Sequence, residues 1–287
     1  MSEKIENILF PTDFSEAANN ALTIAINIAK RELAVLHLLH VIVPECIHVS
    51  FDRRLDVWQD LERQNQKGLK KLSVALEKQY KIIVNTHTSI SYIHAAECIE
   101  QLSEELNASL IVMGSHGLSG TRAFFMGSNT FTVIKNVSCP VLAIPVEYKK
   151  FAFHNILLPV RWMAEVEDRF NIIAHFFKSA STRVEFLGVA SFTDFTLFDC
   201  LTNKIEKLAI NLKNQDIEVI HRNAFCDNIA DFVIEYADAA DIELLVINPM
   251  IDDDWKTFTL GTHTQKILNQ AKKPILCIKS VRNKAKE

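Results

Sequence analysis

The chain has 287 residues, of which 48% are hydrophobic and 23% charged, and its formal net charge is −4. A chain of this size and composition buries a substantial core and holds one large domain or two of ordinary size. Because the charges are interspersed without a basic patch, we expect no nucleic-acid partner. No apolar run approaches the roughly 20 residues of a membrane span, and residues 1–13 hold no signal-peptide core, so we expect a cytoplasmic protein without a membrane partner.

In the first half of the chain, short apolar runs alternate with amphipathic, helical patterns. The runs predict strands over residues 7–12, 34–43, 81–89, 109–114 and 140–146. The helical patterns lie over residues 15–33, about 53–79, 92–106 and 128–137. Ser15 stands at the start of the first helix and is a suitable N-cap.

The strands read as continuous Val/Ile/Leu runs, which is typical of a parallel sheet covered on both faces. Five strands separated by four helical segments predict an α/β, doubly wound domain. In such sheets, ligands bind beyond the carboxyl ends of the strands, where the strand order reverses. With the order 3-2-1-4-5, strands one and four are neighbours at that point. Asp13 and Gly114 stand at their carboxyl ends.

The second half of the chain repeats the first. "NILFPTD" at 7–13 matches "NILLPVR" at 155–161, and "MGSNTFTVIKNVSCPVLAIP" at 126–145 matches "LGTHTQKILNQAKKPILCIK" at 260–279. The matches come in the same order in both halves. The sequence therefore predicts two tandem five-stranded units, over residues 1–148 and 152–281.

Four of the chain's seven glycines lie in "GSHGLSGTRAFFMG" at 114–127. Glycine collects where a side chain would be in the way or where another residue cannot adopt the backbone conformation. A glycine-rich loop between a strand and a helix often lets N–H groups approach a phosphate. A tight turn followed by an ordinary helix cap explains the same residues equally well.

The spacing of these glycines resembles a known signature. Gly114 and Gly117 are separated by two residues, and nine more precede Gly127 and Ser128. Together with "PTD" at 11–13, "LHVI" at 39–42 and "CPVLAIP" at 139–145, this pattern resembles the nucleotide-binding signature of the universal stress protein family. Both halves take part, so the chain is similar to a tandem member. The resemblance implies a Rossmann-like fold of the adenine nucleotide alpha hydrolase type.

The resemblance also implies an adenine nucleotide, usually ATP, with Mg²⁺ on its phosphates, and it implies contacts from eleven residues. On the adenosine side these are Pro11, Thr12, Asp13 and Val41. Around the ribose and the phosphates they are Met113, Gly114, His116, Gly117, Gly127, Ser128 and Asn129. No catalytic residue and no metal site made by protein groups alone is expected.

The residues themselves leave several roles open. Gly127 and Ser128 open a helix, whose unpaired N–H groups and positive dipole end favour an anion. Asp13 either binds a ribose hydroxyl or the Mg²⁺ ion, or caps the helix that follows it. His116 contacts phosphate or faces solvent, and Arg122 reaches the terminal phosphates or is a solvated loop residue. Members of the family often carry a glycine after the third strand, where this chain reads "HTSISYI" at 87–93.

The second half keeps Gly261 and Thr262 but not the rest of the pattern. Asn248 and Ile251 replace the first two glycines, and Arg161 replaces Asp13. Side chains there would obstruct a close approach of the backbone to phosphates, so we expect that this half has lost ATP binding. The acidic residues 252–254 are either a metal site or a solvated loop, and a calcium-type loop needs more ligands at set spacing.

Three functions remain open on the sequence: an ATP-binding regulatory or stress-response protein, a slow ATP hydrolase or phosphotransferase, and an interaction scaffold. The first is favoured because no G-x-x-x-x-G-K-[ST] loop and no catalytic constellation is present. The strands at 140–146 and 274–280 are short and apolar, and each would leave an unpaired edge. We expect them to pair within the chain as a pseudo-dimer, and a homodimer is left open.

Overall fold

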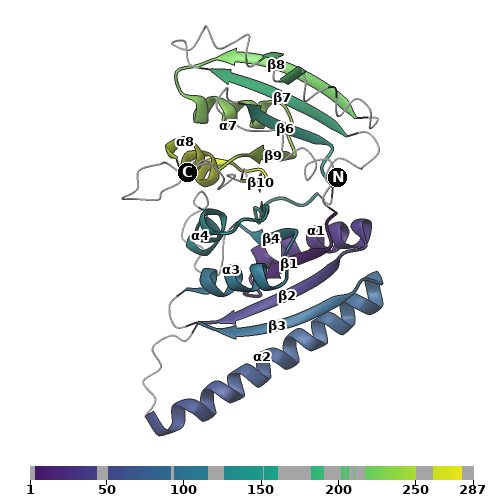
Figure 1. Ribbon diagram of the computed structural model, residues 1–287, viewed down its shortest axis with the longest axis vertical. Coiled ribbons are helices and arrows are strands. Elements are labelled where there is room, and N and C mark those ends of the chain that lie inside the picture. The colour runs from purple at the N-terminus through teal and green to yellow at the C-terminus, as the bar shows by residue number, and fades with distance from the viewer. Residues whose placement is uncertain are drawn as a thin grey trace, which may run out of the picture. The chain divides into compact units, whose positions relative to one another are not determined.

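The computed structural model describes most of the chain in two parts. The described residues are 4–43, 51–91, 94–115, 126–150, 152–160, 182–190, 202–203, 205–206, 210, 217–249 and 261–279, with the backbone alone for 51–59. The chain divides into two compact units (Figure 1). The first consists of residues 5–121 and 127–146, and the second of residues 147–287 with the short pieces 1–4 and 122–126.

The first unit is built on five parallel strands. They are β1 (Asn7–Pro11), β2 (Val35–Ile42), β3 (Val84–Ile90), β4 (Leu110–Gly114) and β5 (Val141–Ile144). Their order in the sheet is β3-β2-β1-β4-β5. This confirms the expected doubly wound α/β sheet and places its switch point between β1 and β4.

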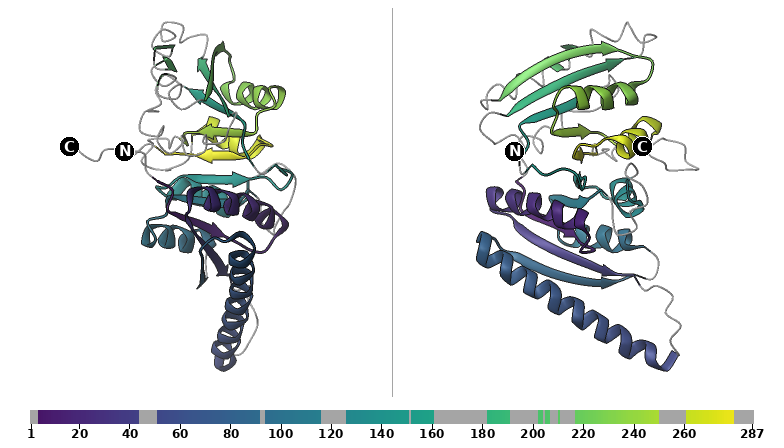
Figure 2. Two further views of the ribbon diagram at one scale, coloured as in Figure 1. Left: turned by 90° about the vertical axis from the view of Figure 1, so that its right-hand side faces the viewer. Right: turned by 180° about the vertical axis from the view of Figure 1, so that it is seen from behind.

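Four helices cover the two faces of this sheet. They are α1 (Glu16–Glu32), α2 (Phe51–Tyr80), α3 (Ala95–Glu105) and α4 (Ser128–Asn136). Helices α1 and α2 lie on one face and α3 and α4 on the other (Figures 1 and 2). Ser15 is the N-cap of α1, as expected, since its Oγ accepts the Ala18 N–H at 3.2 Å. The central strands are fully covered, and Ile8 and Leu9 have no exposed surface.

The second unit has the same strand order as the first. Its strands are β6 (Asn155–Val160), β7 (Arg183–Ala190), β8 (Glu218–Phe225), β9 (Leu244–Ile247) and β10 (Ile275–Cys277). They run parallel in the order β8-β7-β6-β9-β10. The described residues also form the helices α7 (Ile229–Ala239) and α8 (Thr262–Gln270). The repeat in the sequence is therefore a repeat of the fold.

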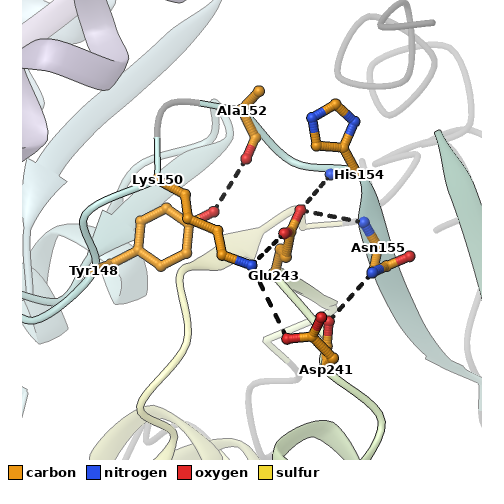
Figure 3. A network of polar contacts seen from close by, with 7 residues as sticks. All are labelled: Tyr148, Lys150, Ala152, His154, Asn155, Asp241 and Glu243. Carbon is orange, nitrogen blue, oxygen red and sulfur yellow. Dashed lines mark hydrogen bonds and ion pairs between the residues drawn. The ribbon is translucent and has the colours of Figure 1, made fainter. Parts of the chain in front are cut away.

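A polar network ties the segment after residue 147 to the second unit (Figure 3). The buried carboxylate of Glu243 accepts the N–H groups of His154 at 2.6 Å and Asn155 at 3.4 Å, and the Lys150 Nζ at 2.5 Å. Burial alone would raise the pKa of Glu243, but these hydrogen bonds outweigh it and lower the pKa. In the first unit the hydroxyl of Ser109 stands at the corresponding place and accepts the N–H of Glu6 at 3.1 Å.

Among the described helices, none combines the length and the apolar composition that a membrane span requires. The assignment of an intact nucleotide motif to residues 1–148 and of a degenerate copy to 152–281 stays a prediction. So does the pairing of 140–146 with 274–280, because it concerns the placement of one unit relative to the other.

Candidate functional site

A pocket opens at the carboxyl ends of β1, β2 and β4 in the first unit. It contains about 650 Å³ of empty space, counting the solvent at its mouth. The lining residues are Pro11, Thr12, Asp13, Ala18, Leu39, Val41, Ala95, Ile99, Met113, Gly114, Gly127, Ser128, Asn129 and Thr130. The pocket therefore lies where the strand order reverses.

The turn between β1 and α1 forms one wall of the pocket and is held by its own side chains. The Thr12 Oγ1 accepts the Phe14 N–H, and the Asp13 Oδ1 accepts the Ser15 N–H, each at 3.0 Å. Such bonds from a side chain to an amide two residues further on are typical of Asx and ST turns. Ser15, and not Asp13, is the N-cap of α1. Asp13 thus shapes the turn and also lines the pocket.

At the end of β4, the packing of the fold itself requires glycine at position 114. A Cβ atom there would stand 2.9 Å from the carbonyl carbon of Ala17 and 3.1 Å from its Cβ. Real Cβ atoms do not approach a backbone atom so closely, so glycine allows α1 to pack against β4. Gly114 also lines the pocket. Its presence alone is therefore no sign of a ligand.

We expect Gly114→Ala to lower the free energy of unfolding by about 1–3 kcal/mol, because the added methyl group overpacks the contact with Ala17. The matched control is Gly68→Ala within α2. A Cβ at Gly68 meets no atom within 4 Å, and alanine is the better helix former by about 1 kcal/mol. Urea denaturation of both variants should show opposite signs. Equal effects would contradict the packing explanation of Gly114.

The first turn of α4 forms the opposite wall of the pocket. Gly127 is its N-cap and provides no capping side chain, and its own N–H donates to the Ser115 carbonyl at 2.7 Å. The Thr130 Oγ1 donates to the Gly114 carbonyl at 3.0 Å and so fixes the helix start to the end of β4. Ser128 and Asn129 are exposed and line the pocket. The amide groups of this turn and the positive end of the helix dipole suit an anion.

Nine of the eleven residues named from the sequence line this one pocket. The other two, His116 and Gly117, lie outside the described residues, as do Gly120 and Arg122. Five lining residues were not predicted from the sequence, namely Ala18, Leu39, Ala95, Ile99 and Thr130. The lining residues Ala18, Ala95 and Ile99 carry no signature of their own, but the pairing of β2 with β1 predicts Leu39, which lies opposite Pro11.

The equivalent region of the second unit is described only in part. Gly261 is the N-cap of α8 with φ −54° and ψ 148°, nearly the same conformation as Gly127 with φ −60° and ψ 144°. Asn248 directly follows β9, where the first unit has Gly114. The expectations for Arg161, Ile251 and the acidic residues 252–254 fall outside the described residues.

Two histidines, the buried His37 and the half-buried His87, lie away from the pocket, against the carboxyl end of α3. The His37 Nδ1 and the His87 Nε2 are 3.1 Å apart, and the His37 Nε2 is 3.2 Å from the Asn7 Oδ1. Asn7 in turn donates its Nδ2 to the Leu106 carbonyl at 3.1 Å. Burial, and then the neighbouring His87, lower the pKa of His37 to about 4. Burial also lowers the pKa of His87, against the opposing effect of Glu105.

Comparison with known families gives a consistent result for the first half of the chain. The profile of the Universal stress protein family matches residues 4–145. The universal stress protein MJ0531 of Methanocaldococcus jannaschii is 32% identical over 141 residues, which are 48% of this chain and 81% of that protein. The universal stress protein YxiE of Bacillus subtilis is 31% identical over 152 residues, 48% of this chain and 97% of that protein.

Solved structures extend the likeness to both halves. The crystal structure of a universal stress protein from Archaeoglobus fulgidus matches 96% of this chain and 99% of its own, with a TM-score of 0.73 and 17% identity. At this identity the likeness concerns the fold alone. It supports the conclusion that the two repeated units are two copies of one fold.

Proposed function

The chain belongs to the universal stress protein family, and on that premise we propose that it is a regulatory protein whose first unit binds ATP with Mg²⁺. The observation that carries the proposal is the meeting of nine residues, named from a sequence signature, in one pocket. They come from four separate stretches of the chain, at 11–13, 41, 113–114 and 127–129. A stress response is the process in which a protein of this family is expected to act.

The chemistry of the pocket suits each part of the nucleotide. The apolar residues Leu39, Val41 and Ile99 provide surface for a base, and the Val41 backbone provides polar groups for its edge. The exposed first turn of α4 offers N–H groups and the Ser128 hydroxyl to the phosphates. Asp13 provides the carboxylate for a ribose hydroxyl or for Mg²⁺. Mg²⁺ is commonly held by one or two carboxylates together with the phosphates of the substrate.

Binding is favoured over hydrolysis by the charges of the described lining. Asp13 is the one titratable side chain among the described lining residues. The described part of the pocket thus offers no lysine or arginine to stabilise a transferring phosphoryl group, which catalysts of this reaction typically provide. ATP occupancy is accordingly proposed to act by stabilising one conformation of the first unit.

The experiment that tests this function is calorimetric titration of the purified chain with ATP in the presence of Mg²⁺. We expect one site per chain, because the glycine pattern is complete in the first half only. Two sites, or none at millimolar ATP, would contradict the proposal. Native mass spectrometry of the purified protein identifies any nucleotide that it retains, and a phosphate-release assay separates binding from turnover.

We expect Asp13→Ala to weaken ATP binding by about 1–3 kcal/mol, since a polar group of the ligand loses its partner. Alanine also removes the acceptor for the Ser15 N–H, so Asp13→Asn is the sharper variant. Asparagine keeps an acceptor for that amide and removes only the charge. Titrations with and without Mg²⁺ separate the two effects. If Asp13→Asn binds Mg²⁺ and ATP as the native chain does, the carboxylate charge has no part in binding.

A further inference from the structure

His40, on the strand β2 beside β1, contacts the turn between β1 and α1 that lines the pocket. His40 itself is not among the lining residues. The Thr12 N–H donates to the Leu39 carbonyl at 2.8 Å. The Thr12 carbonyl accepts from the His40 Nδ1, also at 2.8 Å. A carbonyl only accepts, so the ring carries a proton on Nδ1. Since Thr12 is only 8% exposed, its carbonyl depends on this partner within the protein.

The same imidazole also contacts the other end of the turn. The ring of Phe14 lies over His40, with the ring centroids 4.8 Å apart and the planes at 43°. Phe14 has φ 59°, a left-handed conformation that an aromatic residue adopts rarely and only when its surroundings hold it there. His40 therefore contacts the residue before Asp13 and the residue after it.

We propose that His40 is a positioning residue for the nucleotide: from the rigid strand β2 it fixes Thr12 and Phe14, and through them the direction of the Asp13 carboxylate. This inference rests on the proposed ATP site. Without the imidazole, the Thr12 carbonyl loses its partner and Phe14 is released from a strained conformation. Asp13 then leaves the geometry that the ligand requires, although no atom of His40 needs to touch the ligand.

The test compares His40→Leu with His40→Asn. Leucine fills similar space without a donor, and we expect it to raise the Kd for ATP with Mg²⁺ roughly tenfold, the effect of losing the ligand contact of a displaced Asp13. Asparagine places an N–H near the position of Nδ1, so we expect it to restore most of the affinity. His154→Leu in the second unit is the control and should bind as the native chain does, since the His154 contact to Glu243 comes from its backbone.

Hydrogen exchange without nucleotide gives a second readout. The amides of Phe14 and Ser15, which donate within the turn, should exchange faster in His40→Leu and recover in His40→Asn. The Ile111 amide, which donates to the Pro140 carbonyl, should keep its protection. If His40→Leu fails to fold, Phe14→Ala tests the ring contact with the hydrogen bond intact, and we expect it to weaken binding as well.

The outcomes separate this inference from the proposed function. If the native chain binds ATP and His40→Leu binds it within twofold, the positioning role is overturned and the ATP site stands. Weak binding by both His40→Leu and His40→Asn, with loss of protection at Ile111, would show a general structural role and also overturn it. If the native chain does not bind ATP, the proposed function fails, and unchanged exchange at Phe14 and Ser15 would then overturn the role of His40 in the turn too.

Discussion

Replacing Gly127 by valine is expected to abolish ATP binding while the fold stays intact. Gly127 lines the pocket at the first turn of α4, where we place the phosphates, and a branched side chain would fill their space. The backbone itself accepts the change, because φ −60° and ψ 144° are allowed for any residue. The N–H donated to Ser115 is also retained. We expect the affinity to fall by more than about 100-fold, or roughly 3 kcal/mol.

The second unit provides the matched control for this experiment. Gly261 has the same position and nearly the same conformation at the start of α8. Gly261→Val therefore carries the same cost at the N-cap, about 1 kcal/mol, but should leave ATP affinity unchanged. Calorimetry gives the affinities, and thermal unfolding gives the stabilities. Normal ATP binding by Gly127→Val would show that the phosphates lie elsewhere. Loss of binding in Gly261→Val would show that the second unit takes part.

Acid is expected to destabilise the first unit through His37. Its pKa is about 4 in the folded chain, against about 6.5 in an unfolded one. As the pH falls, the unfolded chain therefore takes up the proton first. The stabilisation is complete above pH 6.5 and is lost as the pH falls from 6.5 toward 4. The difference in pKa corresponds to about 3 kcal/mol, and His37 is only 5% exposed, so solvent screens this effect little.

The hydrogen bonds around His37 explain why its protonated form is disfavoured. Asn7 uses its amide N–H₂ on Leu106, so its Oδ1 faces the His37 Nε2 and accepts from it. The His37 Nδ1 must then accept from the His87 Nε2. A proton on His37 Nδ1 would set two donors against each other. His87 can take a proton on its Nδ1 without breaking the hydrogen bonds from His87 to His37 and from His37 to Asn7. Glu105 favours this protonated form of His87.

The two units allow the effect of acid to be measured against an internal reference. An NMR titration should give a midpoint near 4 for His37, and a midpoint at or above 6.5 would contradict the argument. Hydrogen exchange of the β1 and β2 amides should show a stability that falls below pH 6.5. His37→Gln keeps a donor for Asn7 and removes the titrating group, so the dependence on pH should flatten. The β6 and β7 amides report on the second unit in the same sample.

The second unit places a pair of opposite charges where the first has two histidines. By the strand registers, Glu185 corresponds to His37 and Arg222 to His87. The Arg222 Nε donates to Glu185 at 2.9 Å, and the Tyr236 hydroxyl donates to the same carboxylate. The same buried position between two strands is thus satisfied by neutral hydrogen bonds in one copy and by an ion pair in the other.

The order of the elements and the start of α4 were predictable because they depend on local sequence patterns. Continuous apolar runs mark the buried parallel strands, and Ser15 and Gly127 mark where α1 and α4 begin. The site residues were predictable as a set because the signature fixes their spacing. Its fourteen residues include ten, at 116–125, that lie outside the described residues, so the expectations for His116, Gly117 and Arg122 stay predictions.

Other features depend on contacts that no local pattern contains. The need for glycine at 114 comes from the approach of Ala17, 97 residues earlier in the chain. Nothing in the spacing of His37 and His87 indicates that they meet, because each stands in an ordinary strand pattern. His40 belongs to the quoted "LHVI", yet its hydrogen bond to Thr12 follows only from the packing of β2 beside β1.

The network around Glu243 decides where the chain can be divided. Lys150, His154 and Asn155 all donate to this one carboxylate, and the Tyr148 hydroxyl donates to the Ala152 carbonyl beside it. Residues 148–150 and 152–154 therefore belong to the second unit. A fragment beginning at Phe153 would leave a buried carboxylate without its cation, which typically costs several kcal/mol. A cut between residues 146 and 147 keeps this network whole, because all of its members lie in the second unit.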